Sequence, residues 1–425
     1  METTGSQFKM KGASTMTSAN HQSPIIIVAL ITALSLLGDS MLYIVLPIYW
    51  KEAGLDSIWQ VGLLLSINRF IRLPFNPIVG WLYQRITLRT GLMIAVILGT
   101  VTTIGYGLAQ GFIAWLILRS LWGIAWSFFR IGGLSTVVFY SKDQSRGQSM
   151  GLYNGLHRTG SLAGMLLGGL LVPFIGLQPV AIGFGCLTLI GIPLIFLALK
   201  SGTSGEPDPS SRRARVSFSR HTFLLIVSGF IVTMLFQGVF ASTISSLLEH
   251  LFGVEITIFG LLLSVAFYSG LLQSLRWIWE PYLASRFGHW SDGRSGRLPI
   301  LIVSLAGTAL IFGLMSVPMS IGLWTVLAIA AMVGATALTT LTDALASDAA
   351  KNSNVVSFLT LYSICQDVGA AFGPFLGYLL IGLHYGFSAL YWGGSLIFAV
   401  LTVIWLIIYR RQQRVGAMNS RGMEL

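Results

Sequence analysis

The chain has 425 residues, of which 54% are hydrophobic and 10% charged, whereas soluble domains carry about 25% charged residues. This composition predicts an integral membrane protein. The formal net charge of +11 does not indicate a nucleic-acid binder, because the basic residues stand in short loops between apolar runs. The two cysteines lie inside apolar runs and the six histidines lack ligand spacing, so we expect no disulfide, metal centre or cofactor.

Twelve apolar runs follow a polar N-terminal tail at residues 1–23, and each is long enough to cross a bilayer as a helix. Six fill an N-terminal bundle at residues 24–199, namely 24–49, 58–82, 90–110, 112–139, 148–173 and 178–199. Residues 200–220, rich in Ser, Pro and Arg, indicate a solvated linker. Six more fill a C-terminal bundle at residues 221–409, namely 221–248, 257–284, 298–317, 320–346, 354–382 and 386–409, before a basic tail at residues 410–425. We therefore predict an all-α membrane protein built from two six-helix bundles.

Basic residues predict the orientation of these helices. Most of the 26 lysines and arginines fall in the two tails, the linker and alternate loops, whereas the opposite side of the membrane holds only Lys51. By the positive-inside rule, both termini are expected to be cytoplasmic, and a miscounted helix would destroy this asymmetry.

The start of the eighth run is the least certain boundary. GLLLS at Gly260 and GLLQS at Gly270 each match GLLLS at Gly62 in the second run. The second match keeps the distance from Gly270 to Gly288 equal to that from Gly62 to Gly80.

The two halves share a matching stretch, because Leu152–Leu171 aligns with Leu361–Leu380 without a gap. Glycines recur in it at four-residue steps, on one face of each helix: Gly160, Gly164 and Gly168, and Gly369, Gly373 and Gly377. Such glycines let helix backbones approach closely. On the opposite faces stand Arg158 and Asp367, charges that cost roughly 2.5 to 3.5 kcal/mol at the bilayer centre and need a partner or water.

Two six-helix repeats joined by a basic loop resemble the major facilitator superfamily over nearly the whole chain. The loop after the eighth run resembles the signature loop of that family, with one residue inserted. The matching residues are Gly288, Asp292, Arg294, Gly296 and Arg297. After the second run the same loop is degraded, because Gly80 and Arg85 remain but Gln84 and Thr87 replace the expected Asp and Gly.

Two intramembrane motifs extend the resemblance. Arg119 and Gly123 in the fourth run resemble the family's intramembrane arginine motif. The glycines of the fifth run resemble a motif associated with antiporters, except that Met165 replaces its proline, which the eleventh run retains as Pro374. The resemblance implies that helices 1, 4, 7 and 10 line a central cavity.

A carboxylate in the middle of a membrane helix needs a proton or a positive partner. Asp39 lies in the middle of the first run, and Arg119 is its expected partner. In the drug–proton antiporters that the chain resembles, an acid on helix 1 and the motif arginine take part in coupling. We therefore expect Asp39 and Arg119 to couple transport to protons; a purely structural ion pair is the alternative.

Side chains at helical spacing suggest a substrate cavity. Trp122, Trp126 and Arg130 share one stripe with Arg119, which suits flat amphipathic or anionic substrates if it faces the cavity; otherwise the tryptophans only pack. At about the depth of Arg130, Asp343 is expected to form a cytoplasmic gate with it and with the signature loop, unless it is a solvated residue at a loop edge.

Further intramembrane charges stand at matching places in the two halves. Arg69 and Arg276 have no assigned acid, so they either bind an anionic substrate group or cap carbonyls. The repeat also relates Arg72 to Glu280 and Arg158 to Asp367 with the signs exchanged, which predicts the pairs Arg72–Asp367 and Arg158–Glu280 between the halves. The alternative is that each arginine binds a carbonyl or water.

These patterns together predict a secondary active transporter rather than an enzyme, since the chain has no phosphate-binding loop and no HExxH or nucleophile-elbow motif. We expect proton-coupled export of small amphipathic compounds by a monomer in the plasma membrane, with the bilayer, a small-molecule substrate and protons as partners. Two alternatives stay open: transport of an anionic metabolite, metal chelator or lipid-linked head group, and a transporter-derived sensor or scaffold.

Overall fold

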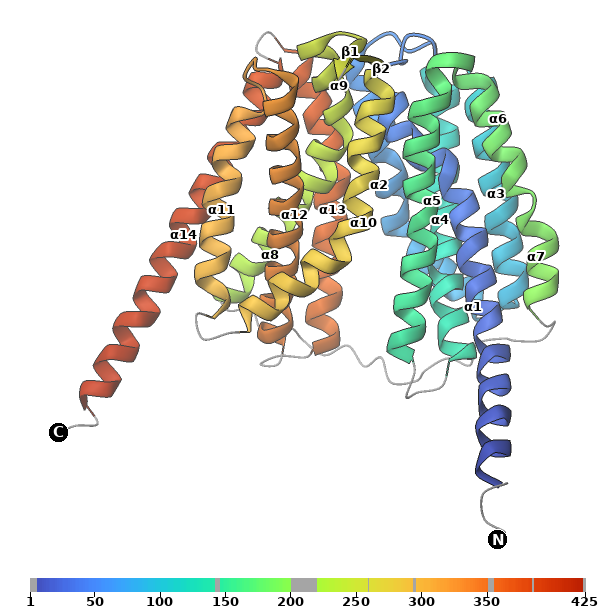
Figure 1. Ribbon diagram of the computed structural model, residues 1–425, viewed down its shortest axis with the longest axis horizontal. Coiled ribbons are helices and arrows are strands. Elements are labelled where there is room, and N and C mark those ends of the chain that lie inside the picture. The colour runs from blue at the N-terminus through green and yellow to red at the C-terminus, as the bar shows by residue number, and fades with distance from the viewer. Residues whose placement is uncertain are drawn as a thin grey trace. The chain divides into compact units, whose positions relative to one another are not determined.

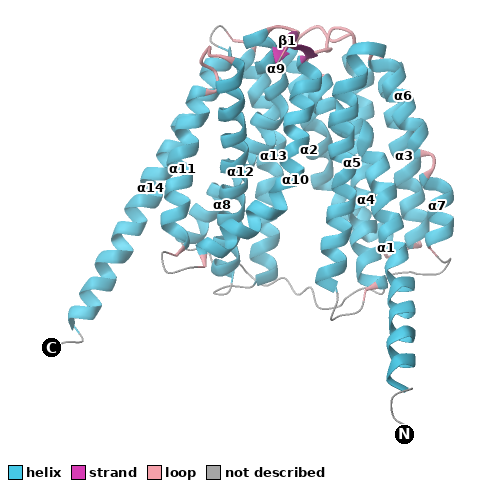
Figure 2. Ribbon diagram, viewed as in Figure 1, coloured by secondary structure: helices cyan, strands magenta, loops and turns pink. Residues whose placement is uncertain are grey.

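The computed structural model describes residues 6–141, 146–199, 220–258, 260–292, 296–350, 355–383 and 386–422. These residues belong to two compact units, each built mainly of long helices (Figures 1 and 2). Unit 1 comprises Met1–Asp56 and Ile67–Ser210, and unit 2 comprises Ser57–Ser66 and Ser211–Leu425. The division after Ser210 falls inside the predicted linker, and the start of the second helix groups with unit 2.

Unit 1 follows the predicted order of helices. Its helices are α1 (Ser6–Val45), α2 (Ile58–Tyr83) from Ile67 onward, α3 (Leu88–Leu108), α4 (Phe112–Tyr140), α5 (Arg146–Ile175), α6 (Leu177–Thr188) and α7 (Gly191–Ala198). α6 and α7 together replace the sixth predicted run. They are separated at Leu189 because Pro193 has no N–H to donate and its ring crowds the carbonyl four residues before it.

Unit 2 contains the remaining helices and one short hairpin. Its elements after the linker are α8 (Arg220–Thr233), η2 (Met234–Phe240), α9 (Ala241–Phe252), β1 (Glu255–Ile258), β2 (Leu261–Ser264), α10 (Val265–Ser291), α11 (Arg297–Leu314), α12 (Ile321–Ala350), α13 (Val355–Ile381) and α14 (Gly386–Gly422). α8, η2 and α9 form one membrane-length segment, Thr222–Phe252, with a π-helical turn in its middle.

Each of the twelve predicted runs has a helical counterpart among the described residues. Ten of these segments are long and apolar enough to cross a membrane by themselves. The other two, α2 and α10, have 26 and 27 residues but carry more charge in their middle, Arg69 and Arg72 in α2 and Arg276, Glu280 and Arg286 in α10. At the chain ends, helix replaces part of the predicted tails, because α1 begins at Ser6 and α14 continues to Gly422.

The eighth predicted run begins in the wrong place. Instead of a helix from residue 257, the chain forms the antiparallel hairpin β1–β2, in which Ile256 pairs with Leu263. The β-branched segment EITI favours a strand, and Gly260 adopts a φ of +80° that favours glycine. α10 then begins after Ser264, whose hydroxyl accepts a hydrogen bond from the Phe267 N–H. Gly260 lies outside this helix, so Gly270 is the counterpart of Gly62.

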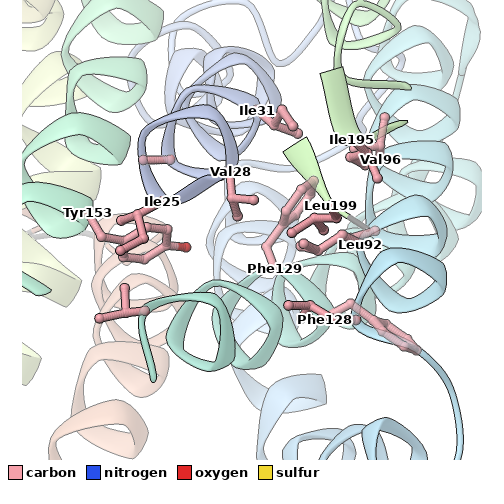
Figure 3. Close-up of a cluster of buried hydrophobic side chains, with 14 of the residues drawn as sticks. Ile25, Val28, Ile31, Leu92, Val96, Phe128, Phe129, Tyr153, Ile195 and Leu199 are labelled. Atoms are coloured by element: carbon pink, nitrogen blue, oxygen red, sulfur yellow. The ribbon is translucent and has the colours of Figure 1, made fainter. Parts of the chain in front are cut away.

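The core of unit 1 is a cluster of buried apolar side chains from six helices, including Val79 and Tyr83 of α2. Figure 3 shows Ile25, Val28 and Ile31 of α1, Leu92 and Val96 of α3, Phe128 and Phe129 of α4, Tyr153 of α5, Ile195 of α7, and Leu199, which follows α7 directly. Because lipid tails are as apolar as these side chains, the stabilisation comes from close packing rather than from removal from water.

The repeated glycines lie where helices meet most closely. A Cβ added to Gly160 or Gly164 of α5 would overlap the carbonyl oxygen of Ala33 or Leu37 on α1. In unit 2, a Cβ on Gly369 of α13 would overlap the carbonyl oxygen of Phe230 on α8. Gly373 is equally close to η2. The fifth helix of one repeat and the eleventh helix of the other therefore pack through the same kind of seam, each within its own unit.

This packing generates a prediction with a matched control on one helix. Gly164→Ala should lower the melting temperature of the purified protein, because overpacking costs about 1 to 3 kcal/mol. Gly155 lies on the same helix with nothing within 4 Å of an added Cβ. Gly155→Ala should leave the melting temperature unchanged or raise it, since alanine favours a helix by about 1 kcal/mol over glycine. Equal melting temperatures for the two variants would contradict the close packing of α5 against α1 at Gly164.

Candidate functional site

A buried ion pair lies inside unit 1. Arg119 of α4 binds Asp39 of α1 through Nη1 and Oδ1. The side chain of Arg119 is 0% exposed and that of Asp39 is 9% exposed. The structure therefore brings together the two residues that the sequence analysis paired, and it shields them from solvent.

Small residues let other helices approach this pair. Asn68 of α2 donates a hydrogen bond from Nδ2 to Oδ1 of Asp39 at 3.3 Å. A Cβ on Gly123 would lie 2.5 Å from the Asn68 carbonyl oxygen, so the glycine of the arginine motif is what allows α2 to come this close to α4. A Cβ on Gly38 would likewise overlap Thr103 of α3. Asp39 thus lies where α1, α2, α3 and α4 converge.

An aromatic stack borders the pair on the α3 side. The Tyr106 hydroxyl lies 3.5 Å from Nη1 of Arg119. Its ring stacks on Trp115, with centroids 5.2 Å apart and planes 1° from parallel. The Trp115 indole donates to the Ala53 carbonyl at 3.1 Å, which fixes the stack to the loop after α1. The sequence analysis did not identify Asn68 or Tyr106. The sequence could have indicated them, because each is a polar side chain inside an apolar run.

The residues of the stripe predicted on α4 differ in burial and in their contacts. Trp122 is fully buried against Leu36 and Ala125, so it packs in the unit 1 core. Trp126 instead has the Arg72 guanidinium over its ring at 5.2 Å. Arg130 is exposed. Trp126 also packs against the cluster that contains Trp122, and the predicted role of the stripe in a substrate cavity stays a prediction.

The two arginines expected to lack an acid differ in their surroundings. Arg69 lies beside Tyr43, with its Nε 3.4 Å from the hydroxyl. Arg276 forms an ion pair with Glu280 at 3.2 Å, one turn further along α10. The expectation that Arg276 has no acid is therefore wrong, because the i,i+4 spacing places Glu280 within reach.

Asp343 is held within unit 2 by neutral donors. Its Oδ1 accepts hydrogen bonds from the Tyr362 hydroxyl and the Gln366 amide, both at 2.9 Å. The residue itself is exposed. Its predicted action as a gate with Arg130 of unit 1 stays a prediction.

The signature-like loop after α10 is anchored by one arginine. Arg297 binds Asp292 at 2.9 Å and Asp348 of α12 at 2.7 Å. The same side chain donates to the Ala344 carbonyl. Gly288 lies in α10 with open space around it, and Arg294 lies outside the described residues. The sequence analysis did not identify Asp348, which lies near the end of α12 and binds Arg297 of the signature-like loop.

The corresponding loop of unit 1 uses its substituted residues differently. Thr87 caps α3 by accepting a hydrogen bond from the Thr90 N–H at 3.2 Å. The Arg85 guanidinium lies 4.0 Å over the Trp81 ring. Thr87 therefore supplies a capping hydroxyl at the start of α3, whereas Gly296 at the start of α11 makes no side-chain cap.

Two repeats of membrane-spanning helices, with charges buried inside a helical bundle, define a multi-pass transporter fold. This assignment agrees with the comparison of the sequence with known families. The chain belongs to the major facilitator superfamily, whose family model matches residues 28–292 and 283–422. It is therefore a membrane transporter of a small-molecule substrate and not an enzyme, as the sequence analysis predicted.

Curated relatives include proteins named multidrug resistance protein MdtG. The protein of that name from Proteus mirabilis (strain HI4320) is 26% identical over 399 residues, covering 89% of this chain and 93% of the relative. Another, from Salmonella arizonae, is 27% identical over 361 residues, covering 81% and 85%.

Solved structures share the fold at low sequence identity. A bacterial homologue of the human lysosomal transporter Spinster, inward-facing and occupied, aligns with a TM-score of 0.69 and 16% identity over 90% of this chain and 94% of its own. A mutant of the peptide transporter POT in complex with sulfate aligns with a TM-score of 0.70 and 14% identity, over 91% and 94%. These alignments confirm the predicted fold.

The contacts of Arg297 predict unequal effects of two substitutions. Arg297→Gln removes both ion pairs, whereas Arg297→Lys keeps the charge but loses the planar fork. Exposed ion pairs contribute only about 0.2 to 1 kcal/mol each, so we expect small changes in melting temperature. Transport by Arg297→Gln should be severalfold slower, with Arg297→Lys in between. Arg286→Gln, which loses only a contact to Tyr282 on the same helix, is the control. Native transport rates in both Arg297 variants would contradict this role.

Proposed function

We propose that the protein is a proton-coupled exporter of small amphipathic compounds that works by alternating access. The observation that supports this most is the Asp39–Arg119 pair, which is buried inside one unit and surrounded by polar groups from neighbouring helices. A carboxylate in such a place changes its charge only by taking up a proton, and that change alters its attraction to the arginine. The names of the curated relatives support multidrug export as the activity.

We propose further that the protein works as a monomer in the plasma membrane with both termini in the cytoplasm. The concentration of lysine and arginine in the tails and the linker supports this orientation. It places the loop after α1, with Lys51, on the outside.

A second candidate function is transport of an anionic solute. The intramembrane arginines of unit 1 support it, because Arg69, Arg72, Arg130 and Arg158 are present in addition to Arg119, which pairs with Asp39, the single acid in these runs. Flux separates the two functions: uptake of a radiolabelled organic anion, with no uptake of an amphipathic dye, would favour the second. A sensor would bind ligand without any flux.

The proposed coupling is tested in liposomes that contain the purified protein. Asp39→Asn should reduce proton-driven uptake of a fluorescent amphipathic cation such as ethidium by about tenfold or more, because the variant carries no exchangeable proton. Glu255→Gln changes an exposed carboxylate on β1 and is the control that should transport normally. Uptake that depends on the pH gradient in Asp39→Asn as in the native protein would refute the coupling role.

A double variant separates coupling from structure. Either single change, Asp39→Asn or Arg119→Gln, disturbs a buried pair, and breaking such a pair costs roughly 3 to 5 kcal/mol. The double change leaves two neutral side chains and should recover the melting temperature. It should not recover proton-driven transport. Recovery of both properties would show that the pair is only structural.

The exchanged charges of the repeats remain a prediction. Arg158→Glu should abolish transport, and adding Glu280→Arg should restore part of it; the same holds for Arg72 with Asp367. Because Glu280 also binds Arg276, Arg276→Gln is needed as a control for the loss of that contact. Failure of both double reversals to recover transport would contradict the pairing.

A further inference from the structure

A pocket lies in unit 1, lined by residues that follow α1 and α3 and by the turn between α5 and α6. In Figure 1 this turn lies at the opposite end of unit 1 from the start of α1. It has a volume of about 300 Å³ and is lined by Glu52, Ala53, Tyr106, Ala109, Gln110, Ile175, Gly176, Leu177, Gln178 and Pro179. The polar residues Glu52, Gln110 and Gln178 are exposed at its rim. Of its other lining residues, Ala53, Tyr106 and Leu177 are buried, with Tyr106 only 1% exposed.

One side chain connects this pocket to the buried ion pair. Tyr106 lines the pocket, and its hydroxyl lies 3.5 Å from the Arg119 nitrogen that binds Asp39. The other charged or titratable groups near the pair within unit 1 are Tyr43 and Arg69. Tyr106 and then Arg119 therefore link the pocket to the Asp39 carboxylate.

Several contacts position Tyr106 and the loop beside it. Tyr106 stacks on the buried Trp115, whose indole binds the Ala53 carbonyl. The Gly111 N–H binds the same carbonyl at 3.2 Å. Gly54 has a φ of +72°, and a Cβ there would lie 2.8 Å from the Gly111 nitrogen, so the loop is fitted closely against the start of α4.

We propose that this pocket is the entrance through which protons from the outer side reach Asp39, and that the Tyr106 ring separates it from the ion pair between exchanges. The inference rests on the proposed proton-coupled function and adds a route for the proton that lies within unit 1 alone. An exporter driven by inward proton flow needs its acid to exchange protons with the outside. The pocket lies at the outer end if the termini are cytoplasmic, and Tyr106 is a positioning residue that controls access.

The first experiment measures proton leak without any substrate. Liposomes containing the protein and an internal pH dye are given a potassium gradient and valinomycin, so that the membrane potential drives protons inward. Tyr106→Ala should leak about tenfold faster than the native protein. Tyr106→Phe, which keeps the ring and the stack on Trp115, should leak no faster than the native protein. Adding Asp39→Asn to Tyr106→Ala should remove the extra leak.

Three results would overturn the proposal. Tyr106→Ala could leak protons no faster than the native protein, Tyr106→Phe could leak as fast as Tyr106→Ala, or the extra leak could persist in the variant that also carries Asp39→Asn. The leak measurement requires no export, so its outcome is independent of whether the protein is a drug exporter. If proton-coupled export fails while the leak pattern holds, the proposed function is wrong and the route remains. If export is proton-coupled but the leak pattern fails, only the route is wrong.

A second experiment avoids any change to the stack. Gln178→Cys is made with Cys186→Ser and Cys365→Ser, which removes the native thiols. Attaching a trimethylammonium group to Cys at position 178 should slow proton-driven export at least severalfold, because a positive charge at the rim repels protons, whereas a sulfonate label of similar size should slow it less. Thr90→Cys, exposed at the opposite end of α3, is the control. Equal effects at both positions, or of both labels, would overturn the proposal.

Discussion

The packing of α1, α2 and α4 in unit 1 must stabilise one ion pair, Asp39 with Arg119, that is removed from water. Taking two ions out of water carries a large desolvation cost, which their attraction offsets only with good geometry and additional hydrogen bonds. Arg119 and Asp39 meet directly, and Asn68 adds a donor to the carboxylate. Gly123 makes that contact possible by admitting α2. The arginine and the glycine of the motif therefore act together: Gly123 lets α2 approach, and Asn68 on α2 then donates a hydrogen bond to the buried pair.

The two units share their packing but differ in where they hold charge. α5 and α13 use glycines at matching positions to approach α1 and the α8–η2 segment. Unit 1 buries its ion pair in the core, whereas unit 2 anchors the loop after α10 through Arg297 at the edge of its bundle. In unit 1 the equivalent loop has a cap, Thr87, in place of the glycine. The two repeats thus share the glycine contacts between their helices but differ in the polar contacts that each of them makes.

Hydropathy and charge placement were sufficient to predict the repeats and nearly every helix, because a span requires a long apolar run whatever its neighbours. The ion pair was predictable for a similar reason, since Asp39 has few possible partners in apolar surroundings. The start of α10 was not, because EITIFGLLLS fits either a helix or a strand. Periodicity placed Trp122 on a face of α4 but did not identify the helix that covers it. Arg276 and Glu280, by contrast, stand four residues apart, and their contact was readable from the sequence.

The proposed coupling role of Asp39 requires surroundings that stabilise this acid in both of its charge states. When Asp39 is ionised, Asn68 donates to it and Arg119 neutralises it. When Asp39 takes up a proton it becomes a donor and needs an acceptor, and the Asn68 amide has one in Oδ1, which makes no hydrogen bond to the described residues. The Tyr106 hydroxyl near Arg119 offers the guanidinium an uncharged acceptor at the same time. Because an amide and a hydroxyl both donate and accept, these two residues suit an acid that alternates between protonation states, whereas a purely structural ion pair would need only donors around the carboxylate.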